Sequence, residues 1–177
     1  MRRVRYVVAM SLDGYIAGPN GEADWIIMDP DIGFRALFEQ FDTFLLGRRT
    51  FEGIGGAGGS RQSGVQTMVF SRTLCQQDYP EVTIVSERPE RALADLRSKP
   101  GGKDIWLFGG GSLFRSLLEV RQVDTVEVSV IPVLLGAGIP LLPSTTSSER
   151  FKLKLTDSRT FKTGIVSLEY AVEYEAA

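Results

Sequence analysis

The sequence predicts an α/β fold in which a mostly parallel sheet ends in an antiparallel hairpin. Short apolar segments alternate with segments of helical periodicity over residues 3–135, which favours a parallel sheet with helices on both faces. Near the end of the chain Val166, Leu168 and Tyr170 alternate with polar residues, as in a strand with one exposed face. Because the 177 residues contain no linker-like segment, we expect one domain spanning 1–177.

The individual elements follow from composition and periodicity. The parallel strands that we expect are 3–10, 43–47, 65–70, 82–85, 105–108 and 123–135, and the hairpin strands are 151–155 and 166–174. The helices that we expect are 29–41, 49–53, 89–99 and 112–119. In the first helix Phe34, Leu37 and Phe38 recur at i, i+3 and i+4, while Pro30 and Asp29 suit its first turn and its N-cap.

The absence of histidine excludes several kinds of chemistry. Ser-His-Asp triads, Cys-His pairs and histidine-ligated metals all need an imidazole, and the single cysteine, Cys75, cannot form a cysteine-rich zinc site. A general acid therefore has to be a carboxyl group, a lysine, a tyrosine or a bound water. We expect no metal in this protein.

Net charge and hydropathy limit the classes of partner that we expect. The net charge of -2 gives no electrostatic reason to expect nucleic acid. No run reaches the about 18 apolar residues of a membrane span, and the apolar run after the basic start is too short for a signal peptide. We expect a soluble cytoplasmic protein with a small-molecule substrate.

Three expected strands end in glycine, hydroxyl or arginine residues. Gly109–Gly111 follow one strand and open a helix, Gly47–Thr50 do the same after another, and Ser71 and Arg72 follow a third. Ligands of open α/β sheets bind beyond the carboxyl ends of the strands, helix N-termini attract anions, and arginine suits bidentate phosphate contacts. Together the three strand ends predict a polyphosphate ligand that lies across this edge of the sheet. The alternative is a tight turn without a ligand and solvated surface arginines.

Other glycine-rich motifs do not fit these residues. A G-x-G-x-x-G dinucleotide motif would need glycine where Phe114 stands, and the chain has no Gly-Lys-Ser/Thr triplet for a P-loop. A nucleophile elbow at Gly110 and Ser112 fails at the same Phe114 and has no histidine to activate the serine.

Five segments in order resemble the dihydrofolate reductase-like superfamily. They are "SLDGYIAGPNG" with "ADW", "LLGRRTFE", "VFSR", "WLFGGGSLFRSLL" and "VSVIPVLLGAGIPLLP". They cover nearly the whole chain, and it looks closest to stand-alone relatives of the reductase domain of the bifunctional riboflavin-pathway deaminase/reductase. The resemblance implies a three-layer dihydrofolate reductase-like fold, a homodimer and hydride transfer. The deaminase partner needs a His/Cys zinc site that this chain cannot form, so the resemblance implies a reductase alone.

The resemblance implies NADPH as the cofactor, bound at the strand ends. Ala9 and Ile16 would contact the nicotinamide carboxamide through their backbones. Ser71 and Arg72, with Arg48 or Arg49, would select the 2′-phosphate, and 109–113 would hold the pyrophosphate next to a cis Gly109–Gly110 bond. The implied cofactor-binding residues are Ala9, Ile16, Gly47, Arg48, Arg49, Thr50, Ser71, Arg72, Phe108, Gly109, Gly110, Gly111, Ser112 and Leu113.

The same resemblance places the substrate beside the first expected helix. Dihydrofolate reductases carry a carboxylate there that binds the pteridine and supports its protonation, and Asp31 stands at the matching place. On a helix Asp31 would share the apolar stripe of Phe34 and Phe38, and burial would raise its pKa. A first-turn residue favoured by the helix dipole, or a role exchanged with Asp29, remain alternatives. The candidate substrate contacts are Trp25, Phe34 and Asp13, although a loop-fixing role suits Asp13 better.

The implied function is NADPH-dependent reduction of a pyrimidine- or pteridine-type substrate, and 5-amino-6-(5-phosphoribosylamino)uracil reductase-like is its best description. Dihydrofolate reductase activity is the alternative among enzymes, although "IPVLLGAGIPLLP" departs from that branch. A catalytically silent NADPH-binding module is the alternative of a different class. The riboflavin-pathway substrate carries a phosphate for which we find no basic site. The glycine-rich stretch 53–64, with Arg61, is a candidate lid.

Overall fold

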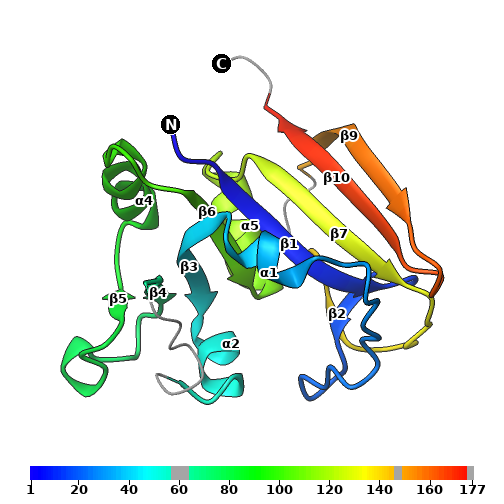
Figure 1. The fold of residues 1–177 in the computed structure, drawn as a ribbon. Helices are drawn as coiled ribbons and strands as arrows, with labels where there is room; N and C mark the ends of the chain where they lie inside the picture. The colour runs from blue at the N-terminus through cyan, green and yellow to red at the C-terminus, as the bar shows by residue number, and fades with distance from the viewer. Residues whose placement is uncertain (57–63, 146–148, 175–177) are drawn as a thin grey trace.

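The structure is a computed structural model that describes residues 1–56, 64–145 and 149–174. Within these residues, eight strands form one sheet in the order β5-β4-β3-β6-β1-β7-β10-β9, and β2 pairs with β8 (Figure 1). The strands are β1 (Val4–Ser11), β2 (Tyr15–Ala17), β3 (Phe41–Gly47), β4 (Gln66–Phe70), β5 (Thr83–Val85), β6 (Asp104–Gly109), β7 (Thr125–Ile131), β8 (Ile139–Pro140), β9 (Lys152–Thr160) and β10 (Val166–Glu173). The helices are α1 (Phe34–Phe38), α2 (Arg48–Gly53), the 3-10 helix η1 (Gln76–Asp78), α4 (Pro89–Ser98) and α5 (Gly111–Glu119).

The large sheet is parallel from β5 to β7 and antiparallel at its last two strands. β1 pairs in parallel with β6 and β7, and β3 pairs in parallel with β4 and β6. β10 runs antiparallel to both β7 and β9. The expected mostly parallel sheet with a C-terminal hairpin is therefore confirmed.

Helices cover both faces of this sheet. On one face Leu45 and Leu107 belong to a core that also contains Leu93 of α4 and Leu117 of α5. Adjacent residues along each strand face opposite ways, so Leu46 of β3 and Trp106 of β6 belong to a second core. That core contains Phe51 of α2 and the partly buried Phe38 of α1. Full burial of each large apolar side chain contributes about 1.5–3 kcal/mol to folding.

The first helix is shorter than the sequence predicts. α1 begins at Phe34, Gly33 is its N-cap residue, and no side chain caps it. Asp29, predicted to cap a helix starting near Pro30, accepts a cap-type hydrogen bond from the Asp31 backbone and also binds Thr163. Residues 29–33 nevertheless form turns, and the chain becomes helical only at Phe34.

The C-terminal hairpin is also less buried than predicted. Every residue of β9 is exposed, and Leu153 and Leu155 are 43% and 51% exposed. β10 is half-buried along most of its length. β9 is the edge strand of the sheet, so within the sheet it borders β10 alone.

The β2–β8 pair lies in segments that the sequence predicts as loops. It joins the chain after β1 to the chain after β7, with Tyr15 opposite Pro140 and Ala17 opposite Ile139. Residues 57–63, which hold Arg61 and most of the candidate lid, lie outside the described residues. In the part of the chain that the structure describes, no helix has the length and apolar character needed to cross a bilayer.

Candidate functional site

The three strand ends singled out in the sequence lie side by side. β4, β3 and β6 are consecutive and parallel, with Gly47 opposite Phe70 and Leu46 opposite Gly109. Their carboxyl ends therefore meet at one edge, the lower edge in Figure 1, where α2 begins. β1 follows β6 in the sheet, so its carboxyl end extends the same edge.

Glycine backbones from β3 and β6 approach each other at this edge. A Cβ atom at Gly47 would lie 3.7 Å from both the Gly109 carbonyl oxygen and the Gly110 nitrogen. The Gly109–Gly110 peptide bond is cis, as the resemblance implies, and Gly109 has a φ of 142°. A Cβ at Gly110 would lie 3.2 Å from Thr50 Oγ1, so a side chain there would crowd the hydroxyl. We call these four residues (Gly47, Thr50, Gly109 and Gly110) the glycine cradle.

Gly111 has a different reason to be glycine. A Cβ there would lie 2.7 Å from the Pro140 carbonyl oxygen and 2.9 Å from Pro143 Cδ. Since backbone and a proline ring cannot move aside cheaply, this position is restricted by the packing of the 140–143 segment against α5. Gly111 is therefore needed for the fold itself, whether or not a ligand is bound.

The N-terminus of α5 opens beside the cradle. The Phe114 nitrogen donates to the Gly110 carbonyl at 3.0 Å, and Gly110 is the N-cap residue without a side-chain cap. The backbone N–H groups of Gly111, Ser112 and Leu113 precede this first helical bond, so the helix itself offers them no acceptor. The Ser112 side chain is exposed, whereas Leu113 belongs to the core. The helix end can therefore present donors to an anion.

The arginines at this edge are exposed. Arg48 makes a long contact of 3.8 Å with Glu52. Among the described residues, Arg49 and Arg72 form no ion pair. Ser71 is buried, and its Oγ accepts hydrogen bonds from the backbones of Thr73 at 3.2 Å and Leu74 at 3.1 Å. Ser71 thus fixes the turn that presents Arg72, while its own contact with a 2′-phosphate stays a prediction.

Other predicted site residues lie around the end of β1. Ala9 packs with Trp25 in a small cluster built on Ile131, Phe161 and Ile165. Ile16 is half-buried in β2. Phe108 is half-buried at the end of β6, with its ring centroid 5.4 Å from that of Trp106.

Asp13 is a loop-fixing residue. Its carboxylate accepts hydrogen bonds from Ser11 Oγ at 2.7 Å, Gly136 N at 2.7 Å and Leu135 N at 3.1 Å. The Ser11 hydroxyl, with the two backbone donors, holds the pKa of Asp13 below its usual value. The carboxylate therefore ties the chain after β1 to the chain after β7, and a substrate contact by Asp13 stays a prediction.

The prediction that Asp31 lies on the apolar stripe of a helix is wrong. Asp31 precedes α1 and is exposed, because the helix begins only at Phe34. The buried carboxylate of this region is Asp29, which is 3% exposed. The Thr163 hydroxyl and the Asp31 backbone lower the pKa of Asp29. A proton-donating role for Asp31 stays a prediction. Because Asp31 is exposed, burial no longer supports that role.

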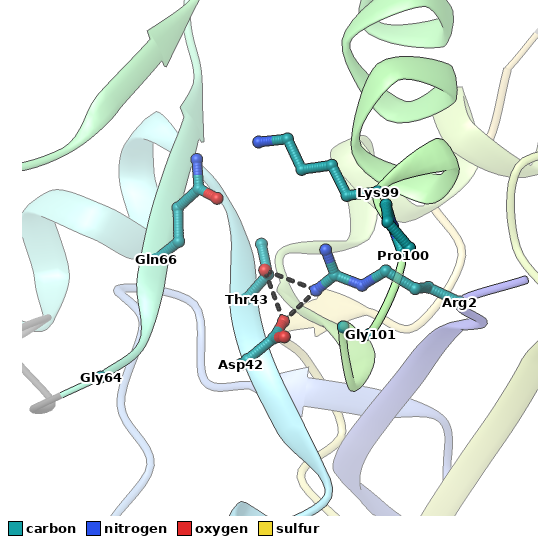
Figure 2. A pocket seen from close by; sticks show the side chains of 9 residues that line it. Arg2, Asp42, Thr43, Gly64, Gln66, Lys99, Pro100 and Gly101 are labelled. Atoms are coloured by element: carbon teal, nitrogen blue, oxygen red, sulfur yellow. Dashed lines mark hydrogen bonds and ion pairs between the residues drawn. The ribbon is translucent and has the colours of Figure 1, made fainter.

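A surface hollow lies at the opposite end of the sheet. It has a volume of about 310 Å³ and is lined by residues before or at the start of β1, β3, β4 and β6, among them Arg2, Asp42, Gln66 and Lys99 (Figure 2). The Arg2 guanidinium already contacts Asp42, Thr43 Oγ1 and the Lys103 carbonyl. Because its donors are bonded within the fold, we do not place the functional site there.

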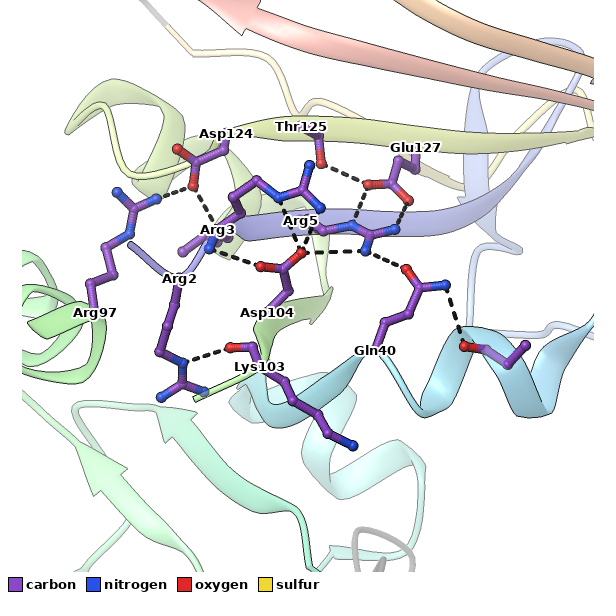
Figure 3. Close-up of polar contacts among 12 residues, drawn as sticks. Arg2, Arg3, Arg5, Gln40, Arg97, Lys103, Asp104, Asp124, Thr125 and Glu127 are labelled. Atoms are coloured by element: carbon purple, nitrogen blue, oxygen red, sulfur yellow. Dashed lines mark hydrogen bonds and ion pairs between the residues drawn. The ribbon is translucent and has the colours of Figure 1, made fainter. Parts of the chain in front are cut away.

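The same end holds a network of arginines and carboxylates that the sequence did not reveal (Figure 3). Arg5 donates to both oxygens of Glu127 at 2.7 Å and to Gln40 Oε1 at 2.6 Å. Arg3 donates to Asp104 at 2.7 Å. The partners are 35 to 122 positions apart in the sequence, so no local pattern could identify these pairs.

Comparisons with known proteins show the family of this chain. The RibD C-terminal domain family matches residues 2–167. YyaP of Bacillus subtilis (strain 168) is 36% identical over 182 residues, covering 96% of this chain and 94% of YyaP.

A Shewanella sp. PV-4 structure, whose name alone assigns it to riboflavin biosynthesis, has a TM-score of 0.81 and 27% identity, covering 98% of this chain and 100% of that one. Dihydrofolate reductase from Enterococcus faecalis, complexed with NADP(H), has a TM-score of 0.68 and 20% identity, with 97% of each chain covered. Because the RibD C-terminal domain family matches residues 2–167, nearly the whole chain, this protein belongs to that family.

Proposed function

We propose that this protein is an NADPH-dependent reductase of a pyrimidine- or pteridine-type substrate, of the riboflavin-pathway type. Membership of the RibD C-terminal domain family supports a reductase. The observation that carries the proposal is the glycine cradle, where bare backbone from two adjacent strand ends lies beside Thr50 and the start of α5. The NADP(H) bound to the structurally similar Enterococcus faecalis enzyme supports this choice of cofactor.

The residues at this edge fit a phosphorylated dinucleotide. Diphosphate oxygens would accept hydrogen bonds from the N–H groups of Gly111 and Ser112 and from the Thr50 hydroxyl. The lack of side chains at Gly109 and Gly110 leaves the backbone open to such a contact. Arg72, presented by the Ser71 turn, would then meet a 2′-phosphate farther along the edge.

The strand order, with the proposed contacts of Arg72 and Ala9, would give the cofactor a direction. β4 carries Arg72, β3 and β6 carry the cradle, and β1 carries Ala9. A dinucleotide lying along β4-β3-β6-β1 would thus have its 2′-phosphate over β4 and its nicotinamide over β1. When bound, the nicotinamide supplies the hydride. The protein orients it, and the substrate would lie between Ala9 and the 25–34 segment.

Cofactor titration tests the proposal. NADPH should bind with a dissociation constant at least about tenfold below that of NADH, because the 2′-phosphate adds charge-assisted hydrogen bonds. The measurement is NADPH fluorescence or calorimetry at fixed salt. Gly110→Val should abolish binding by filling the cradle. Equal affinity for NADPH and NADH would contradict the cofactor assignment.

Turnover then identifies the substrate. NADPH oxidation at 340 nm should be stimulated by 5-amino-6-(5-phosphoribosylamino)uracil, and by dihydrofolate less or not at all. If dihydrofolate is the better substrate, the riboflavin-pathway assignment is wrong. If NADPH binds and neither compound is reduced, the chain is the catalytically silent binding module.

A further inference from the structure

We infer that Asp29 is a positioning residue, and that its bond to Thr163 holds the Gly18–Ile32 segment in place at the nicotinamide side of the site. The inference rests on the proposed function, because it assigns the nicotinamide to the end of β1. The sequence offers Asp29 only as a helix cap or as an alternative to Asp31. It is nevertheless the buried carboxylate of the whole segment between β2 and α1.

The hydrogen bonds of this segment are mostly internal. Gly18 N donates to Glu22 O, Ile26 N to Ala23 O, and Trp25 Nε1 to Glu22 O. Among the described residues, the hydrogen bonds that join the segment to residues beyond α1 come from Thr163 to Asp29. Among hydrogen bonds, a segment without a regular helix or strand is therefore tied to the β9–β10 turn by one side chain.

The Asp29–Thr163 clasp uses both oxygens of the carboxylate. Oδ2 accepts the Thr163 hydroxyl at 2.7 Å and the Thr163 backbone N–H at 3.3 Å. Oδ1 accepts the Asp31 backbone N–H at 2.8 Å. Thus the same group that anchors the segment also shapes the turn that carries Asp31. The opposite charge of Arg159, on the same hairpin, further favours the ionised form.

Apolar packing beside the clasp reaches the end of β1. Trp25, Ile26 and Ile32 pack against a cluster of Ile131, Phe161 and Ile165, and Ala9 of β1 packs against the same cluster. This small core therefore joins the segment to β1. Release of the clasp would let the segment move away from Ala9, where the resemblance places the nicotinamide carboxamide. The clasp would thereby act on the nicotinamide half of the cofactor and leave the adenosine half untouched.

The test compares two ligands in Thr163→Val, which removes the hydroxyl donor and keeps the size of the side chain. NADPH affinity should fall about tenfold, as for a lost hydrogen bond to a charged group. Affinity for 2′,5′-ADP, which lacks the nicotinamide, should stay within about twofold because that half shares no partner with the clasp. Thr163→Ser, which keeps the hydroxyl, should restore NADPH affinity. Thr160→Val on the exposed strand β9 is the matched control.

A second readout follows Trp25 directly. Energy transfer from Trp25 to bound NADPH should weaken in Thr163→Val and in Asp29→Ala, and Trp25→Phe identifies the share of Trp25 against that of Trp106. In the absence of cofactor, acrylamide should quench Trp25 more strongly in Thr163→Val than in Thr163→Ser. This reading needs neither NADPH nor turnover.

The outcomes separate the two proposals. If the wild type binds neither 2′,5′-ADP nor NADPH, the proposed function fails, and the positioning role fails with it. If both ligands bind, but Thr163→Val equals Thr163→Ser in NADPH affinity and in Trp25 quenching, the clasp inference alone is overturned. If Thr163→Val loses affinity for both ligands equally, the bond is structural and does not position the nicotinamide side.

Discussion

The two ends of the parallel strands carry similar numbers of arginines in opposite states. At the amino ends, Arg2 and Arg5 have side chains that are 6% and 7% exposed, and both are paired with carboxylates. At the carboxyl ends, Arg49 and Arg72 are exposed and form no ion pair among the described residues. The glycine cradle and the open N-terminus of α5 also lie at the carboxyl ends of the strands.

The difference teaches how to separate structural arginines from candidate ligand-binding ones in a protein of low net charge. A buried arginine whose donors all meet protein acceptors has been matched within the fold, and removal of either partner leaves the other charge uncompensated. An exposed arginine at a strand end can stay unpaired in water without destabilising the fold. Its guanidinium is then available to bind a phosphate. The partners of an arginine are therefore a better guide than its position in the sequence.

The largest expected effect comes from breaking the amino-end network. Arg5→Ala should lower the free energy of unfolding by about 3–5 kcal/mol, because it leaves the mostly buried Glu127 carboxylate without its opposite charge and with only the Thr125 hydroxyl as a donor. Arg3→Ala is the control, since the Arg3 side chain is 53% exposed and should cost less than about 1 kcal/mol. Urea unfolding measures both. Equal losses in the two variants would contradict the distinction drawn between buried and exposed pairs.

An intermediate effect is expected at the carboxyl end, and on binding only. Arg72→Ala should weaken NADPH binding by about 1.5–3 kcal/mol, the contribution of a hydrogen bond to a charged group. NADH binding should not change, and the unfolding free energy should stay within about 0.5 kcal/mol. Arg91→Ala, an exposed arginine on α4, is the comparison. Unchanged NADPH/NADH preference in Arg72→Ala would remove this residue from the 2′-phosphate site.

The smallest effect is a pH dependence of the amino-end network. Burial alone would raise the pKa of Asp104, but the hydrogen bonds and charge of Arg3 and the charge of Arg5 hold it below 3.8. The folded state thus gains stability above that ordinary value and loses it as pH falls through the lowered one. Asp104→Asn should flatten the loss of stability as the pH falls below about 4, by less than about 1 kcal/mol. If the wild type and Asp104→Asn lose the same unfolding free energy as the pH falls, Asp104 does not titrate in this window.

Much of the fold could be predicted because its signals are local. Apolar runs define β1, β3, β4 and β6, and Pro89 marks the start of α4 as expected. The alternation of strands and helices gives the parallel sheet. It also brings Gly47, Ser71 and Gly109 to one edge, which no single motif states.

What could not be predicted depends on long-range contacts. Asp29 looks like a helix cap in sequence, but its partner Thr163 lies 134 positions away. The periodicity of Phe34, Leu37 and Phe38 is real, yet it does not say where the helix starts. Gly111 looks equivalent to Gly109 and Gly110, and only the structure shows that Pro140 restricts it.

Gly111 links two stretches of chain that are almost 30 positions apart. The closeness of its backbone to Pro140 and Pro143 means that neither "FGGGS" nor "AGIPLLP" can be altered alone without a clash or a void. Transplanting this glycine turn into another member of the family would thus require moving both pieces as a set. Libraries that vary one while fixing the other should yield mostly insoluble clones, however well the inserted residues suit a coenzyme.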